Sequence, residues 1–178
     1  LYSSAASDVY KRQSIGFLTE EQTPMIWRGP MVTSAIKTFT QKVKWQDLDF
    51  IIVDMPPGTS DSPLTVMQTI PMDGFVVVST PQELANMDAK RCINMIRKLN
   101  LNVLGVVENY SGDVFGQGGG IKMANDVGTD FLGTLSLSAS YKDNSKPTVL
   151  VDDAVAEEYE NIMGGMQESL AKLGLDPA

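Results

Sequence analysis

The sequence DFIIVDMPPGTSD, residues 49–61, decides the fold of this 178-residue chain. The four apolar residues 50–53 run without a polar interruption into Asp54, and a Pro-Pro-Gly sequence then ends the extended segment. This pattern predicts a strand that is buried on both faces and whose carboxyl end delivers an acid into a loop. Ligands of open α/β sheets bind outside the carboxyl ends of the strands, so Asp54 is a candidate site residue. An aspartate that only caps a helix or a turn is the alternative.

Apolar strands and amphipathic helices alternate along the rest of the chain. Continuous apolar runs predict strands at residues 14–18, 74–79, 103–107 and 131–137, and a brief extended piece at 148–151. The helical spacing of apolar residues predicts helices at about residues 31–45, 62–70, 83–99, 121–127 and 154–173. The last helix is expected to carry on its inner side Tyr159, Ile162, Met163, Met166, Leu170 and Leu173. This alternation predicts an α/β fold with a mostly parallel sheet and helices on both faces.

The composition excludes several classes of protein. The net charge is −8 and the pI about 4.5, which argues against a nucleic-acid-binding groove. With no histidine and one cysteine, Cys92, the chain cannot form a Ser-His-Asp triad, a Cys/His zinc site or an internal disulfide. The apolar runs are much shorter than the roughly 18 residues that span a bilayer, so we expect no membrane segment. Nothing in the chain needs or exploits an oxidising compartment, so we expect a cytoplasmic protein. Residues 1–13 show neither the helical nor the strand period of apolar residues, and we expect them to be a non-native or disordered leader.

Several motifs occur together in the order of one known family. They are DxPPGTxD at residues 54–61, IWRGPM at 26–31, VEN at 107–109 and GxGGG at 116–120. In this combination the chain resembles the Mrp/ApbC family of MinD-type P-loop ATPases, which are iron–sulfur cluster carriers. The resemblance implies that residues 49–61 contain the Walker B strand and switch II.

The resemblance also assigns candidate roles to these residues. Asp54 would hold the Mg²⁺ that bridges the nucleotide phosphates, and Gly58 would approach the γ-phosphate with its backbone N–H. Asp61 would orient water or contact a partner subunit, although a helix-capping aspartate ahead of a proline explains it equally well. Asn109 would pair with the adenine edge, because an amide offers a donor and an acceptor together. Gln82, at another strand end, belongs only to the neighbourhood of the site.

The glycine-rich residues 116–120 do not form a Walker A motif. GxxxxGK[ST] requires a lysine and a hydroxyl after the glycines, and this sequence occurs nowhere in the chain. We therefore interpret the glycines as a tightly turning helix entrance. In the resembled family the Walker A lysines and the switch I aspartate lie on segments that would precede Ser14. We expect residues 14–178 to be a partial P-loop ATPase domain that binds ATP poorly by itself.

The resemblance implies a function with ATP and Mg²⁺ as cofactors. That function is ATP-dependent carriage or assembly of iron–sulfur clusters by a homodimer, with apo iron–sulfur proteins as recipients. Family members often hold a [4Fe–4S] cluster with a Cys-x-x-Cys pair from each of two chains. This pair is absent, and Cys92 lies on an apolar helical stripe, which makes a cluster held in the usual way doubtful. The alternatives are a MinD/ParA-like dimerisation switch without a cluster and an inactive remnant.

Overall fold

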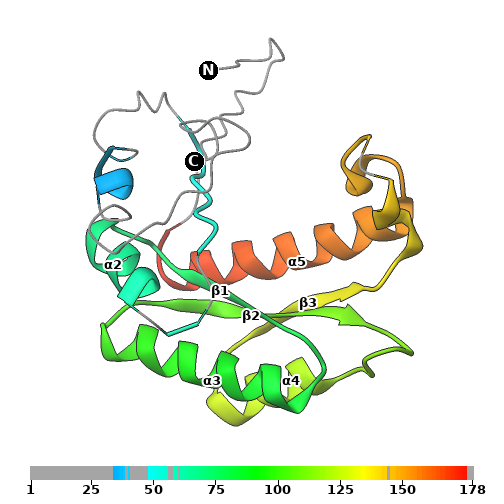
Figure 1. Ribbon diagram of the computed structural model, residues 1–178, viewed down its shortest axis with the longest axis horizontal. Coiled ribbons are helices and arrows are strands. Elements are labelled where there is room, and N and C mark those ends of the chain that lie inside the picture. The colour runs from blue at the N-terminus through cyan, green and yellow to red at the C-terminus, as the bar shows by residue number, and fades with distance from the viewer. Residues whose placement is uncertain are drawn as a thin grey trace, which may run out of the picture. The chain divides into compact units, whose positions relative to one another are not determined.

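The computed structural model describes residues 34–38, 40, 48–55, 58–59, 61–143 and 145–175 (Figure 1). The chain divides into two compact units, Leu1–Pro71 with Ala178 and Met72–Pro177, and each is described here by itself. The predicted strand at residues 14–18 and the IWRGPM motif lie outside the described residues. Of the helix predicted at residues 31–45, residues 34–38 and 40 are described, and they are helical.

A three-stranded parallel sheet forms the centre of the second unit. The order is β1-β2-β3, with β1 at Phe75–Ser79, β2 at Val103–Ser111 and β3 at Phe131–Ser136. The middle strand β2 is buried from Leu104 to Glu108, as expected for a strand that has neighbours on both sides and layers on both faces. The three apolar runs predicted as strands in this unit are therefore confirmed.

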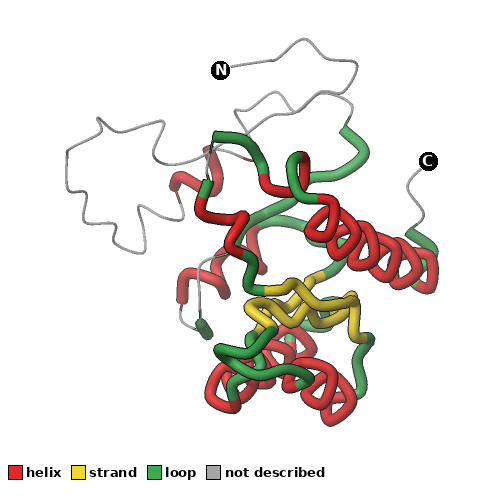
Figure 2. Tube along the Cα trace, turned by 90° about the vertical axis from the view of Figure 1, so that its right-hand side faces the viewer, coloured by secondary structure: helices red, strands yellow, loops and turns green. Residues whose placement is uncertain are grey.

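Helices cover both faces of this sheet. Helices α3 (Glu83–Lys98) and α4 (Gly119–Val127) pack against one face, and α5 (Asp153–Lys172) packs against the other (Figures 1 and 2). On the α3 side, Ile93 and Ile96 are almost completely buried. On the α5 side, Val107, Leu132, Leu135 and Ile162 form one buried apolar cluster. The predicted α/β layering is confirmed.

Glycines allow α5 to lie directly on β3. A Cβ atom at Gly133 would lie 2.7 Å from Cγ1 of Ile162, and one at Gly165 would lie 3.3 Å from the carbonyl oxygen of Leu132. By contrast, nothing lies within 4 Å of a Cβ at Gly164. Gly165 therefore permits close packing of α5 on β3, whereas a larger side chain would fit at Gly164.

Two expectations for the second unit were wrong. Residues 148–151 were expected to be extended, but Thr148–Leu150 form a 3₁₀ turn, η3, closed by a bond from the Leu150 N–H to the Pro147 carbonyl at 2.9 Å. The turn leads directly into α5: the N–H of Asp152, which caps α5, donates to the Thr148 carbonyl at 3.0 Å. Three residues expected on the inner side of the terminal helix, Tyr159, Met163 and Leu173, are 39%, 40% and 42% exposed.

The predicted central strand in the first unit was also wrong. Residues 50–53 have no strand structure, and Ile51 and Ile52 are 56% and 87% exposed. Apolar, β-branched residues favour an extended chain, but a strand exists only when its backbone groups pair with a neighbour. The helix predicted at residues 62–70 is present as α2, Asp61–Thr69.

Candidate functional site

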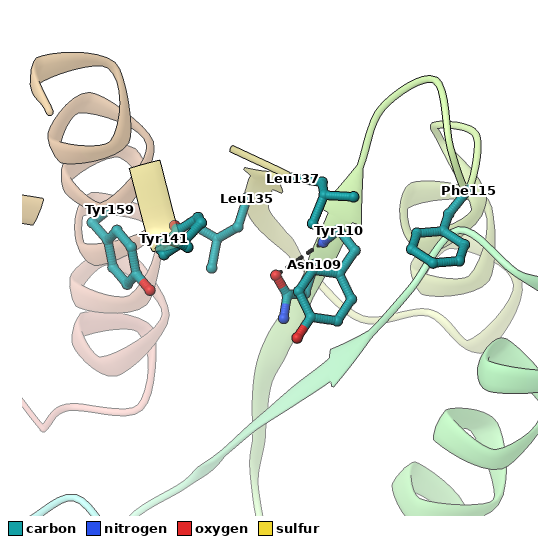
Figure 3. A pocket seen from close by; sticks show the side chains of 7 residues that line it. All are labelled: Asn109, Tyr110, Phe115, Leu135, Leu137, Tyr141 and Tyr159. Atoms are coloured by element: carbon teal, nitrogen blue, oxygen red, sulfur yellow. Dashed lines mark hydrogen bonds between the residues drawn. The ribbon is translucent and has the colours of Figure 1, made fainter. Parts of the chain in front are cut away.

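A pocket of about 470 Å³ opens at the carboxyl ends of β2 and β3 (Figure 3). Its volume is in the range of small-molecule sites, which is roughly 300–1,000 Å³. Two strands, the loop after β2, the 3₁₀ turn η2 (Ala139–Lys142) and helix α5 contribute side chains to it. The lining residues are Asn109, Tyr110, Phe115, Leu135, Leu137, Tyr141 and Tyr159. The predicted site residue Asn109 therefore lies in a pocket of mainly aromatic and apolar character.

A β-bulge aims two consecutive residues of β2 into this pocket. β2 pairs with β3 at Glu108 and again at Ser111, and between these pairs Asn109 and Tyr110 stand opposite the single residue Leu135. Such a bulge bends the strand and redirects its side chains. Tyr110 takes the left-handed backbone conformation, with φ of 59°. Consecutive residues of a regular strand point to opposite faces, so the bulge explains how both side chains line one pocket.

The orientation of the Asn109 amide follows from one hydrogen bond. The backbone N–H of Tyr110 donates to Oδ1 of Asn109 at 2.9 Å (Figure 3). A backbone N–H must face an oxygen, so this bond settles which end of the amide carries the nitrogen. Nδ2 then has two N–H groups to offer, and Oδ1 keeps one lone pair. Asn109 therefore presents mainly a hydrogen-bond donor to a ligand.

Aromatic rings form two opposite walls of the pocket. Tyr110 and Phe115 lie on one side, with their ring centroids 6.3 Å apart and their planes tilted by 39°. Tyr141 and Tyr159 lie on the other side (Figure 3). Partial burial, followed by the adjacent Tyr159, raises the pKa of Tyr141 to about 12. The pocket thus combines flat apolar walls with one oriented amide, an arrangement suited to a planar ring with a polar edge.

A buried acid, Glu108, lies directly behind the bulge, and the sequence analysis assigned it no role. Its side chain is 1% exposed. Oε1 accepts hydrogen bonds from Oγ of Ser111 at 2.8 Å and from the N–H of Gly118 at 3.0 Å, and Oε2 accepts one from the N–H of Gly120 at 2.6 Å. A buried carboxylate needs such donors. The sequence carries no direct signal for this contact, because two of the three donors are backbone amides.

The glycine-rich segment is a helix entrance, as predicted. Gly118 is the N-cap residue of α4, with φ of 81°, and the helix begins at Gly119. A Cβ at Gly119 would lie 2.2 Å from the carbonyl oxygen of Pro81, so only glycine fits here. Two backbone N–H groups of this turn bind the carboxylate of Glu108. The amides that would otherwise resemble a phosphate loop are thus satisfied from within the chain.

The remaining predicted site residues are not among those that line the pocket. Gln82 is exposed at the N-cap of α3, and its side chain makes no capping bond. In the first unit, Asp54 and Gly58 are exposed, and Gly58 has a positive φ of 84°. Asp61 is the first residue of α2 and is exposed as well. The catalytic and metal-binding roles of these residues stay predictions.

Comparison with known proteins identifies the family. The profile described as the ParA family, NUBPL iron-transfer P-loop NTPase, matches residues 4–169. The chain belongs to this family. The iron–sulfur cluster carrier protein of Methanocaldococcus jannaschii is 39% identical over 185 residues, covering 96% of this chain and 64% of the relative. The mouse iron–sulfur cluster transfer protein NUBPL is 45% identical over 142 residues, covering 74% of this chain and 44% of the relative.

Solved structures of similar proteins agree with this assignment. A nucleotide-binding protein from Archaeoglobus fulgidus in complex with ADP has a TM-score of 0.58 at 32% identity, covering 72% of this chain and 55% of that one. The cell division ATPase MinD of Pyrococcus furiosus has a TM-score of 0.56 at 18% identity, covering 80% and 57%. At that identity MinD supports the fold alone. The chain spans 64%, 53% and 54% of the carrier proteins from M. jannaschii, Pseudomonas fragi and Pyrococcus horikoshii.

The described residues of this NUBPL-family chain do not fit a cysteine-ligated cluster. The loop after β2 closes on itself through two backbone bonds between Gly112 and Gly116, of 2.9 and 2.8 Å, and contains no thiol. Cys92 is half-buried in α3, and burial raises the pKa of its thiol, which disfavours the thiolate that binds iron. Within the described residues, no three acidic, cysteine or histidine side chains gather closely enough to hold a metal ion.

The described residues also bear on membrane insertion. No helix among them combines the length and apolar character needed to cross a bilayer.

Proposed function

We propose that this chain is the nucleotide-binding part of an ATP-dependent iron–sulfur cluster carrier. The observation that carries the proposal is the Asn109 pocket at the carboxyl ends of β2 and β3, in a chain of a P-loop NTPase family. The names of the curated relatives support cluster carriage as the task of the whole protein. The complex of the A. fulgidus relative with ADP supports a nucleotide as the ligand.

In this proposal the pocket binds the adenine base. The Nδ2 group of Asn109 donates a hydrogen bond to an acceptor nitrogen on the purine edge, because its Oδ1 already accepts from Tyr110. The rings of Tyr110 and Phe115 contact one side of the base, and those of Tyr141 and Tyr159 border the other. Aromatic side chains are effective partners for the flat faces of bases, at about 1–3 kcal/mol per base.

The first unit supplies the groups for phosphoryl transfer. Asp54 is an accessible carboxylate, and Mg²⁺ commonly takes one or two carboxylates together with waters and phosphates, so the residue fits this ion. When bound, Mg²⁺ would neutralise charge on the phosphates. Gly58, whose positive φ its missing side chain allows, would offer its N–H to the γ-phosphate, and Asp61 would orient the attacking water. Gln82, the N-cap residue of α3 in the second unit, stays a candidate neighbour of the nucleotide.

The carrier proposal includes a homodimer in the cytoplasm that delivers clusters to apo iron–sulfur proteins. The chain has one cysteine, so two copies offer two thiolates at most. The remaining ligands of a four-thiolate cluster must then come from further sequence of the same protein or from the recipient. The second candidate is a nucleotide-dependent dimerisation switch without a cluster, which the missing Cys-x-x-Cys pair favours.

Nucleotide binding is tested by titrating ADP into the protein encoded by the full open reading frame. We expect Asn109→Ala to weaken binding by about tenfold, because a buried hydrogen bond to the ligand is lost. Asn161→Ala, on the exposed surface of α5, is the matched control and should bind like the unsubstituted protein. Equal affinity of both variants would refute the assignment of the pocket.

Cluster carriage is tested by anaerobic reconstitution with iron and sulfide, followed by visible absorption. A cluster-specific band supports the carrier, whereas a colourless protein that still dimerises with ATP supports the switch. Cys92→Ala separates the sources of ligand. If the band survives this substitution, the thiolates come from elsewhere in the protein.

A further inference from the structure

We propose that Glu108 is the positioning residue of the pocket. Its carboxylate ties the bulge of β2 to the glycine-rich entrance of α4, and thereby sets where Asn109 and Tyr110 point. Glu108 itself is fully buried and does not line the pocket. The ligand named in the test below rests on the proposed function, whereas the structural role of Glu108 does not.

The first connection crosses the bulge. Glu108 and Ser111 flank the bulge, and each pairs with a residue of β3. Across the bulge, Oγ of Ser111 donates to Oε1 of Glu108 at 2.8 Å. Between these two residues, Tyr110 has the left-handed backbone conformation. A non-glycine residue in this conformation persists only where its surroundings hold it. The Glu108–Ser111 bond supplies such a restraint directly.

The second connection holds the far end of the loop. The N–H groups of Gly118 and Gly120 donate to the two carboxylate oxygens of Glu108 at 3.0 and 2.6 Å. Phe115, which forms one wall of the pocket, lies on the loop between Ser111 and Gly118. Both ends of that loop are therefore bonded to the same carboxylate. The bonds between Gly112 and Gly116 then fix the loop internally.

The contact depends on matched sizes and charges. A Cβ atom at Gly120 would lie 2.9 Å from Cβ of Glu108 and 3.1 Å from its Oε2, so the start of α4 can come this close only with glycine. The N-terminus of a helix also carries a partial positive charge, which stabilises a carboxylate placed there. The bonded partners of Glu108 in the described residues are one hydroxyl and two backbone amides.

Glutamine has the same shape as glutamate but cannot replace this function. Its single oxygen can accept from one side of the contact, while its NH₂ group would face another donor. Glu108→Gln should therefore release either Gly118 or Gly120. We expect hydrogen exchange of the amides in residues 112–120 to accelerate by about tenfold or more, with little change in β1 or α5. Glu160→Gln, an exposed acid on α5, is the matched control and should leave exchange unchanged.

A nucleotide-binding measurement separates positioning from general stability. In the protein encoded by the full open reading frame, Glu108→Gln should weaken the binding of ADP by about tenfold. The binding of tripolyphosphate, which has no base, should stay unchanged. Equal weakening of both ligands, or unchanged loop exchange, would overturn the proposal. If the unsubstituted protein binds neither ligand, the proposed nucleotide function fails and the exchange result alone decides on Glu108. Should Glu108→Gln not fold, Ser111→Ala is the second variant, because it removes a single bond to Glu108. It must then accelerate exchange in residues 112–120 and weaken the binding of ADP, each by a smaller factor.

Discussion

Replacing Gly119 with alanine tests how closely α4 is held against the turn that precedes α3. The added Cβ would lie 2.2 Å from the carbonyl oxygen of Pro81 and 2.8 Å from Nδ2 of Asn86. Ordinary contact begins near 3.4 Å, so the helix start must retreat by about 1.2 Å. The obstacle is backbone, which cannot swing aside as a side chain can. Overpacking of this kind costs about 1–3 kcal/mol.

Gly164→Ala is the matched control, because it makes the same chemical change within a helix. Nothing lies within 4 Å of its new Cβ, so we expect a gain of about 0.5–1 kcal/mol from the stiffer unfolded chain. For a chain of this length, 1 kcal/mol shifts Tm by about 2–4 °C. Thermal unfolding followed by circular dichroism should therefore place Gly119→Ala below the unsubstituted protein and Gly164→Ala above it. If Gly119→Ala melts as high as Gly164→Ala, the inferred close packing is wrong.

Three further predictions concern stability and titration. Ile93→Ala removes a fully buried side chain and should cost about 2–5 kcal/mol in urea unfolding, whereas Leu84→Ala, on a residue 77% exposed, should stay within about 0.5 kcal/mol. Spectrophotometric titration should show a tyrosine that ionises only near pH 12, and Tyr141→Phe should remove this transition. Because folding raises the pKa of Tyr141, the contribution of its neutral hydroxyl to the stability of the fold is present below pH 10 and is lost as the pH rises toward 12. The Ser140 hydroxyl and backbone amides lower the pKa of Asp152, so its stabilising effect is present near neutral pH and lost in acid, and Asp152→Ala should flatten the acid side of the Tm profile.

The pattern of apolar residues predicted the second unit well. Three strands and three helices lie close to their predicted positions because each apolar run is paired or covered within the unit. Residues 50–53 have the most strongly strand-like composition of all, yet they are not a strand. Composition describes how one segment would fit a sheet, whereas strand formation depends on backbone partners from elsewhere in the chain.

The candidate site was predicted only in part. The family motif predicted Asn109 as a site residue just past its strand, whereas the structure places it inside β2, at a bulge and in the lining of the pocket. A bulge adds a residue without changing the apolar pattern, so periodicity does not reveal it. Tyr159 was assigned to the core because it follows the helical spacing of the apolar residues of α5, but it lines the pocket. Glu108 was missed because two of its three partners, Gly118 and Gly120, follow ten and twelve residues later and bind through backbone amides, which every residue except proline possesses.

The contact between Glu108 and Gly120 also restricts how this family can diverge. The two positions share one small volume, and neither can grow unless the other shrinks. Relatives that carry alanine at the position of Gly120 should therefore carry a shorter residue, such as aspartate or serine, at that of Glu108. Covariation of these two columns in an alignment of the family would be the evolutionary record of this steric constraint, and independent variation would show that the helix start can be attached to the sheet in other ways.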